Sequence, residues 1–362
     1  MNKRVLFETI RTLVAIGVAL LLALIIIFSV SDEPGYALER FLLGPVTNLR
    51  NFGNVLEMAI PLIFTGLAIS VMFMAKQFNL GAEGGFFFGA VGATALVLTF
   101  NLPPVILPVA AIIVGALAGG LGSALPAVLK ARMGASELVS SLMMNFILFW
   151  LGLFIINNYF RDAMAGAMAS HRFPDAAKLT RILPGTRLHF GIFIALAMVV
   201  VVYLFLYRSR WGYALRMVGL NIRFAEYSGI NTKSVILYSQ IIGGMIAGMG
   251  GTVELLGMYP RFTWFQLPGY GWDGVIVAIM ARNNPLLVPV FAFFLAYLRI
   301  GADIMARVTD VPSEVVAIIQ GVMIMLVTAE RLLAGWRHRM VVKEKMKAAE
   351  AAEVEGGGVQ HG

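Results

Sequence analysis

The chain has no cysteine and few charged residues. Without cysteine among its 362 residues, disulfides, thiolate zinc sites, cysteine-ligated iron–sulfur clusters and cysteine nucleophiles are excluded. Only 13% of the residues are charged, whereas 59% are hydrophobic. The mean hydropathy of +0.83 is outside the range of water-soluble globular chains. These values predict an all-α, polytopic membrane protein.

Motifs for catalysis and metal binding are also missing. The sequence has no G-x-x-x-x-G-K-[ST] loop, so we expect no ATP hydrolysis by this chain. Its four histidines, His171, His189, His338 and His361, are far apart and lack the H-E-x-x-H spacing of a zinc site. We therefore predict no catalytic residue, no metal site and no cofactor in this chain.

Long uncharged runs predict about ten membrane-spanning helices, because each crossing needs about 20 apolar residues. The runs lie at 12–30, 58–75, 84–129, 138–160, 190–207, 234–253, 274–281, 283–298 and 315–329. The run at 84–129 is long enough for two spans, which Pro103 and Pro104 divide. The eighth crossing is unusually short. We predict one transmembrane domain over residues 1–335 and a cytoplasmic tail over 336–362 with a disordered end.

The net charge of +8 is interpreted as membrane topology and not as nucleic-acid binding, because Lys and Arg gather in cytoplasmic loops. With the N-terminus inside, about 18 of the basic residues fall on cytoplasmic segments, which favours both termini inside. The outer loop at about 159–188 disagrees with this pattern, because it holds five basic and two acidic residues.

Two predicted spans carry small residues at helical spacing. One has Gly115 and Gly119, and the other has Gly244 and Gly248. Such faces let helix backbones approach closely. We expect packing inside the chain, with a dimer seam as the alternative.

Acidic residues near or inside the apolar runs are candidates for function, because a charge in the bilayer is unfavourable. They are Glu57, Glu83, Glu254 and Asp273. Glu83 and Asp273 lie in glycine-rich interruptions, at 78–85 and 268–274, as broken helices of an inverted repeat would. These two carboxylates either cap half-helices or contact a solute.

The loop at about 208–233 carries five basic residues and one acid. Phe224, Tyr227 and Ile230 have helical spacing, and Gly229 is a plausible helix stop. A short amphipathic helix here would present its face to a partner or, alternatively, to lipid headgroups.

The pattern Gly219-x-Asn221-x-x-x-Ala225-x-Tyr227-Ser228-Gly229-Ile230 resembles the coupling segment of permease subunits in bacterial binding-protein-dependent ABC importers. Three further segments resemble those of nucleoside and simple-sugar permeases of the branched-chain amino acid/ribose superfamily. They are residues 78–84, 269–274 and 281–286. The resemblance covers about residues 10–335. Ala82 stands where relatives often carry Val, and Phe86 follows Gly85 where a Gln is common.

This resemblance implies a type II importer permease fold with an inverted repeat, in the bacterial cytoplasmic (inner) membrane. It implies a second permease subunit, identical or related, two cytoplasmic ATPase subunits that bind ATP and Mg²⁺, and an extracytoplasmic substrate-binding protein. The solute would be a nucleoside or simple sugar.

We expect two sets of residues to carry these functions. Coupling to the ATPase is expected of Arg216, Gly219, Asn221, Arg223, Phe224, Ala225, Tyr227, Gly229 and Ile230. Substrate contact is expected of Asn79, Glu83, Phe86, Phe87, Asn145, Tyr270, Trp272, Asp273 and Asn283. Polar members of the second set would supply hydrogen bonds, and its aromatic members would stack on a base or sugar.

Two other function classes compete with this interpretation. An ion-coupled secondary transporter has similar broken helices and would use Glu83 and Asp273 as ion sites. An intramembrane aspartyl protease has a Gly-x-Gly-Asp motif, but the spacing at 269–273 differs by one residue and no second Tyr-Asp pair lies in an apolar run.

Overall fold

The computed structural model describes residues 25, 27–312, 315, 318 and 321. Most of the predicted spans at 12–30 and 315–329, and the whole tail at 336–362, lie outside the described residues. The chain forms two compact units, one of residues 40–304 and one of residues 1–39 with 305–362. In the second unit, the Ser31 hydroxyl donates to Asp310 Oδ1 (2.6 Å) and the Asp32 N–H donates to Asp310 Oδ2 (2.7 Å).

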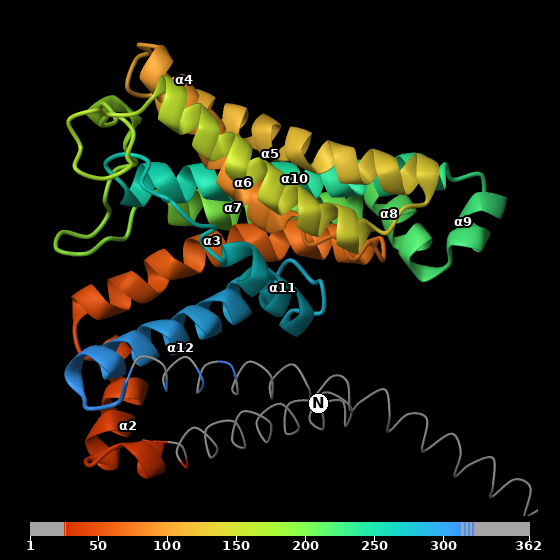
Figure 1. The fold of residues 1–362 in the computed structure, drawn as a ribbon. Helices are drawn as coiled ribbons and strands as arrows, with labels where there is room; N and C mark the ends of the chain where they lie inside the picture. Colours follow the sequence, from red (N-terminus) through yellow and green to blue (C-terminus); the bar gives the residue numbers. More distant parts are fainter. Residues whose placement is uncertain (1–24, 26, 313–314, 316–317, 319–320, 322–362) are drawn as a thin grey trace, which may run out of the picture. The chain divides into compact units, whose positions relative to one another are not determined.

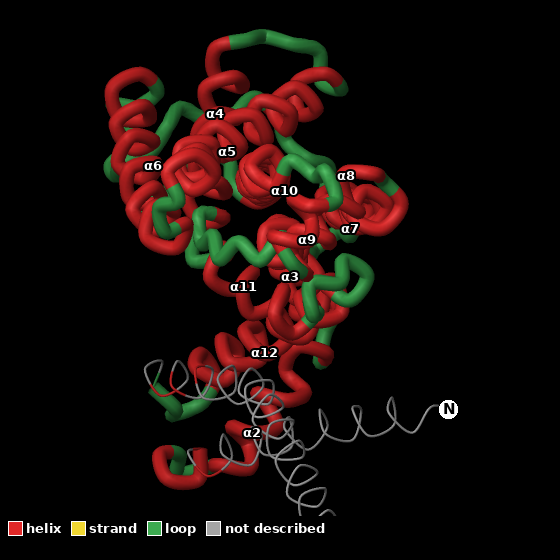
Figure 2. Tube along the Cα trace, turned by 90° about the vertical axis from the view of Figure 1, so that its right-hand side faces the viewer, coloured by secondary structure: helices red, strands yellow, loops and turns green. Residues whose placement is uncertain are grey.

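Every regular element of the described residues is helical (Figure 2). In chain order these are α2 (Pro34–Leu43), η1 (Gly44–Val46), α3 (Leu49–Met74), α4 (Ala82–Thr99), α5 (Ile106–Met133), α6 (Glu137–Tyr159), η2 (Asp175–Ala177), α7 (Gly191–Arg208), α8 (Arg210–Leu220), α9 (Ile222–Tyr227), α10 (Thr232–Met258), α11 (Tyr270–Met280) and α12 (Val288–Val308). Seven helices, α3, α4, α5, α6, α7, α10 and α12, are long and apolar enough to cross a membrane.

The predicted all-α, polytopic architecture is confirmed for the described residues. The run at 84–129 does divide into α4 and α5, with Pro103 and Pro104 in the connection. The short eighth crossing corresponds to α11, which has 11 residues. The total of ten crossings stays a prediction, because two of them lie largely outside the described residues.

Helix α10 is the centre of the unit formed by residues 40–304. It packs on α5, α4 and α3, and α11 packs on α3 and α4 (Figures 1 and 2). The predicted small-residue faces meet at the contact of α10 with α5. A Cβ added at Gly248 would lie 2.2 Å from the Gly115 carbonyl oxygen, and one at Gly119 would lie 2.3 Å from the Gly244 carbonyl oxygen. Backbones this close leave no room for a side chain, so internal packing is confirmed for this face.

The linker between α6 and α7 lies against the end of α10. The Phe173 N–H donates to the Pro260 carbonyl (2.9 Å), and the Leu179 N–H donates to the Leu256 carbonyl (3.1 Å). Arg261 forms an ion pair with Asp162 (3.2 Å). The linker therefore covers one end of the bundle as an ordered layer.

The close contact of α5 with α10 predicts that an alanine at Gly248 and an alanine at Gly35 affect the melting temperature differently. Gly248→Ala should lower the melting temperature of the detergent-solubilised protein, because the new methyl group meets backbone atoms. Gly35→Ala should leave it unchanged or raise it, because no atom lies within 4 Å of a Cβ at that helical position and alanine favours helix by about 0.5–1 kcal/mol. Equal effects at both positions would contradict the packing described above.

Candidate functional site

The first interruption, between α3 and α4, covers residues 75–81. The expectation that all of 78–85 is broken is wrong at its end, because Gly84 and Gly85 lie inside α4. The expectation for 268–274 is wrong in the same way, since α11 already begins at Tyr270. In both places the later glycines serve close packing. A Cβ at Gly271, for example, would lie 2.5 Å from the Glu83 backbone nitrogen.

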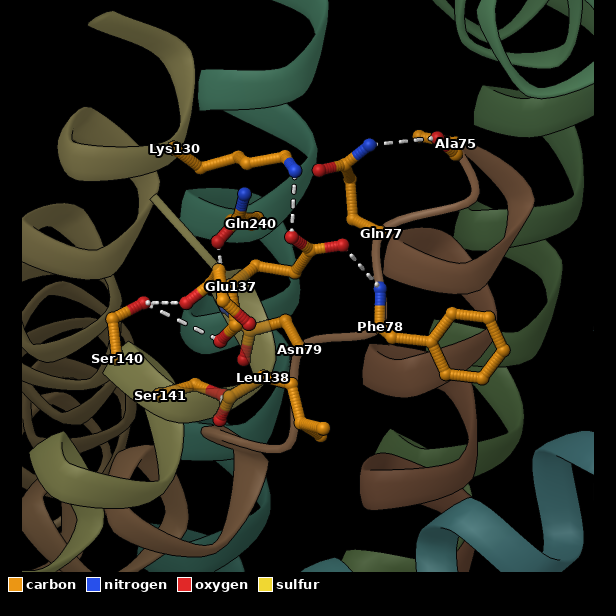
Figure 3. Close-up of polar contacts among 11 residues, drawn as sticks. Ala75, Gln77, Phe78, Asn79, Lys130, Glu137, Leu138, Ser140, Ser141 and Gln240 are labelled. Atoms are coloured by element: carbon orange, nitrogen blue, oxygen red, sulfur yellow. Dashed lines mark hydrogen bonds and ion pairs between the residues drawn. The ribbon is translucent and has the colours of Figure 1, made fainter. Parts of the chain in front are cut away.

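Side chains of α6 and α10 hold the first interruption (Figure 3). The Phe78 N–H donates to Glu137 (3.3 Å), and the Leu80 N–H donates to the Ser141 hydroxyl (3.0 Å). The Asn79 amide donates to Gln240 Oε1 (2.6 Å). Non-helical backbone at membrane depth has to be satisfied by protein or water, and here the protein satisfies these groups.

Asn145 on α6 also binds the backbone of this interruption. Its Oδ1 accepts from the Gly84 N–H (2.9 Å) and its Nδ2 donates to the Leu80 carbonyl (3.0 Å). Both Asn79 and Asn145 are buried. The Asn79 side chain also accepts from the Gly81 N–H (2.7 Å), so both amides proposed for solute contact are engaged within the chain in this conformation.

Glu83 joins the two interruptions of the chain. It stands in the first turn of α4, and its Oε1 and Oε2 accept from the N–H groups of Gly269 (2.6 Å) and Gly271 (2.5 Å) at the start of α11. A carboxylate at a helix N-terminus satisfies free donors and matches the helix dipole. The capping role considered for Glu83 is thus present, but on α11 and not on its own helix.

Asp273 behaves differently. It lies in the first turn of α11, and its buried carboxylate forms an ion pair with the partly exposed Arg299 of α12 (Nη2 to Oδ1, 2.6 Å). The side-chain contact of Asp273 is thus an ion pair with Arg299 and not the helix cap considered from the sequence. Arg299 follows directly after the uncharged run at 283–298, so the sequence analysis did not consider it as a partner.

An aromatic cluster lies beside Glu83. Phe86 stacks on Trp264 (ring centroids 5.8 Å apart, planes at 17°) and also contacts Tyr270. Phe87 contacts Trp264 and Phe262. Sequence analysis missed Trp264 and Phe262, although the aromatic density of 259–265 was a usable signal. Of the predicted stacking residues, Trp272 is 49% exposed and has no ring contact among those described for this cluster.

Asn283 lies apart from the other proposed solute-contact residues. It lines a groove at the ends of α3 and α8, together with Lys76, Tyr213 and Arg216. Asn283 has φ +53, in the left-handed region. The structure therefore places it beside the predicted coupling segment.

The predicted coupling segment is two helices, α8 and α9. Asn221 separates them and caps α9 by accepting from the Phe224 N–H (3.2 Å). Gly229 has φ +79, and the Ile230 N–H donates to the Ala225 carbonyl (3.0 Å). This geometry is typical of a helix ended by glycine, so the predicted helix stop at Gly229 is confirmed.

The exposed face of this segment is aromatic. Phe224 is 54% and Tyr227 is 92% exposed, and Arg223 is also exposed. Ala225 is buried, and Ile230 is half-buried. Arg216 is half-buried. It donates to the Leu206 carbonyl (2.6 Å) and lies over the Tyr207 ring, and its expected role in coupling to the ATPase stays a prediction.

Gly219 joins this segment to α3. A Cβ added at Gly219 would lie 1.9 Å from the Met74 carbonyl oxygen, so the two backbones touch. Lys76 Nζ also donates to the Leu220 carbonyl (3.4 Å). Residues 75–81 follow directly after this contact. Helix α8 therefore packs against the chain immediately before the first interruption.

Comparison with known proteins gives consistent similarities. The family described as the permease component of the branched-chain amino acid transport system matches residues 51–328. A glucose ABC transporter permease protein of Haloferax volcanii is 30% identical over 333 residues, which cover 89% of this chain and 86% of the relative. A guanosine ABC transporter permease protein of Bacillus subtilis is 32% identical over 280 residues, with 76% and 80% covered.

A third relative matches almost end to end. A nucleoside ABC transporter permease protein of Lactococcus lactis subsp. cremoris is 26% identical over 358 residues, which cover 95% of this chain and 96% of the relative. No solved structure shows significant similarity to this chain.

The contact of Glu83 with α11 predicts a stability effect. Glu83→Gln leaves one acceptor oxygen for the half-buried Gly269 N–H and the buried Gly271 N–H, and a buried donor without an acceptor costs about 1–3 kcal/mol. The melting temperature should therefore fall, whereas Glu39→Gln, at an exposed position, should leave it unchanged. A Glu83→Gln protein as stable as the Glu39→Gln control would contradict this role.

The ion pair of Asp273 with Arg299 predicts non-additive substitutions. Arg299→Gln leaves the buried Asp273 carboxylate without a counter-charge, at a cost of up to about 3–5 kcal/mol, whereas Asp273→Asn should cost less, because the Arg299 side chain is 30% exposed. The double variant should recover most of the lost stability in thermal unfolding. If the two losses simply add, the pair does not stabilise the fold as described.

Proposed function

Because the chain belongs to the family of branched-chain amino acid transport system permease components, we propose that it forms half of the channel of an ATP-driven importer. It is a multi-pass membrane protein with at least seven apolar helices of spanning length. The family supplies membrane subunits, so ATP and Mg²⁺ would bind to separate ATPase subunits. One observation in this chain supports the proposal most strongly: helices α8 and α9 expose aromatic side chains, and α8 packs against the end of α3.

The other partners follow from the same assignment. A second permease, identical or related, would complete the channel, and an extracytoplasmic binding protein would deliver the solute. The chain would lie in the bacterial cytoplasmic membrane with both termini inside. Support comes from the basic residues around α8, because Lys and Arg favour the cytoplasmic side. Arg208, Arg210, Arg223 and Lys233 are among them.

The solute would be a nucleoside or a simple sugar. Relatives named for guanosine, nucleoside and glucose transport support this choice. Phe86, Phe87, Trp264 and Tyr270 offer flat ring faces near the start of α11, and base or sugar rings stack on such faces. Phe86 and Phe87 are fully buried, so contact with solute requires the surrounding helices to separate.

Energy would pass from the ATPase to the channel by direct contacts. Movement of α8 and α9 shifts the end of α3 through Gly219 and Met74. The interruption at 75–81 follows, and Glu83 transmits the shift to α11 through two hydrogen bonds. Such a route biases the channel because its contacts differ between the inward-open and outward-open states.

An ion-coupled transporter is the second candidate, and the family assignment argues against it. The two carboxylates that it would use also have protein partners in this conformation. Glu83 accepts from α11, and Asp273 pairs with Arg299.

The exposed aromatic face of α9 predicts how the ATPase binds. Tyr227→Ala in the affinity-tagged chain, expressed in its native cells, should reduce co-purified ATPase about tenfold, because aromatic anchors dominate protein interfaces. Tyr159→Ala is the matched control, since Tyr159 is also a highly exposed tyrosine, at 70%, on α6. Equal recovery of ATPase with both variants would contradict docking at α9.

A further inference from the structure

Three side chains from distant parts of the sequence form a buried polar cluster. Glu57 comes from α3, Glu254 from α10 and His189 from the linker before α7. Polar atoms of the three lie within 4.8 Å of one another. All three residues are buried, and His189 is completely inaccessible. The proposed transport mechanism does not use this cluster.

The surrounding backbone makes room for the imidazole. A Cβ at Gly257 of α10 would lie 2.3 Å from His189 Cε1, and a Cβ at Gly191 would lie 2.5 Å from the same atom. A β-bridge from Arg181 to His189 and a hydrogen bond from the Phe190 N–H to the Thr180 carbonyl (2.9 Å) hold the linker there. The ring is thus fixed between α7 and α10.

The position of the ring proton follows from two observations. Burial, and to a lesser extent the positive charge of Arg181, lower the pKa of His189 to about 4, so the imidazole is neutral at neutral pH. The Gly191 N–H donates to His189 Nδ1 (3.1 Å). A neutral imidazole has one N–H, so the proton is on Nε2. This nitrogen has no hydrogen-bond partner among the described residues, and neither has Glu254 Oε2.

The two carboxyls are in direct contact. Glu57 and Glu254 share a side-chain hydrogen bond. Ionised carboxylates only accept hydrogen bonds, so a hydrogen bond between them requires a proton on one of them. The Tyr270 hydroxyl also hydrogen-bonds to Glu254. The other titratable groups that act on this pair are Tyr259, at the end of α10, and Arg187, on the exposed surface of the linker.

A metal ion would be the usual ligand of one histidine and two glutamates. A metal binds a deprotonated imidazole nitrogen, however. In this cluster Nδ1 is occupied as an acceptor and Nε2 carries the proton. The arrangement therefore offers an N–H donor to an oxygen atom and not a lone pair to a cation.

We propose that Glu57, Glu254 and His189 form a proton-binding site, in which the two carboxyls share one proton beside the neutral imidazole of His189. The site ties α3 to α10, and it includes α11 through Tyr270 and the linker through His189. Loss of the shared proton places two negative charges side by side in a buried site, which is strongly unfavourable. Alkaline pH should therefore loosen the contacts of these elements. This proposal does not depend on the importer function.

Infrared spectroscopy of the full-length protein at neutral pH tests the site directly. The wild type should show a carbonyl band of a protonated carboxylic acid, which shifts in D₂O. Glu57→Gln and Glu254→Gln should each remove it, because either change leaves a pair with no shared acidic proton, whereas Glu39→Gln, at an exposed position, should keep it. A wild-type spectrum without such a band would overturn the proposal, whatever the folding of the variants.

The pH dependence of stability provides a second measurement. The melting temperature of the wild type should fall by several degrees between about pH 6 and about pH 9, because the folded pair still holds a proton that the unfolded carboxylates have released. The fall should be smaller in the Glu57→Gln/Glu254→Gln double variant. Parallel pH curves would contradict the proposal.

Metal analysis provides a third measurement. If the wild type contained a stoichiometric divalent metal that is absent from the double variant, the cluster would be a metal site and the proposal would be wrong.

Discussion

A helix that begins inside a membrane protein exposes backbone N–H groups where no bulk water can satisfy them. In this chain one carboxylate, Glu83, resolves this constraint for α11 by accepting from Gly269 and Gly271. Because Glu83 itself stands at the start of α4, the contact joins the two interrupted regions of the chain. Gly271 also approaches the Glu83 backbone closely, so the starts of α4 and α11 pack directly against each other. Any movement of the first interruption should therefore reach α11.

The other buried acids are satisfied in different ways. Asp273 has a cationic partner, Arg299, whereas Glu57 and Glu254 have each other. An ion pair depends on both charges, and a carboxyl pair depends on a proton. The bundle thus carries a charge-dependent contact between α11 and α12, a proton-dependent contact between α3 and α10, and a backbone-dependent contact between α4 and α11. Each responds to a different substitution, so their contributions can be separated.

Local patterns in the sequence were enough to predict much of the fold. Uncharged runs marked the spanning helices, paired prolines marked the division of α4 from α5, and Gly229 marked the end of the coupling segment. The small-residue faces predicted the packing of α5 on α10. Each of these signals depends on neighbouring residues or on one helical face, which a single sequence contains in full.

The pairings within the site were not predictable in this way. Glu83 and Gly269 are distant in sequence, as are Asn79 and Gln240 or His189 and Glu57, and nothing in one sequence says which buried polar groups meet. Asn283 and Trp272 were selected by their position in a motif. The structure places Asn283 in the groove beside α8, and Trp272 is 49% exposed without a ring contact to the aromatic cluster. Glycines were interpreted as helix breakers at 84 and 271, where helix packing was the stronger constraint.

The central claim is that this chain moves solute only when a docked ATPase drives α8 against the end of α3. Uptake of labelled guanosine and glucose into vesicles, at zero ion gradient, measures this directly. Vesicles with the complete transporter should accumulate solute only with ATP. In a transporter that carries Gly219→Ala, the ATPase should hydrolyse ATP without solute uptake, because the added methyl group separates α8 from Met74. Equally fast uptake by this subunit alone, without any nucleotide, would contradict the account.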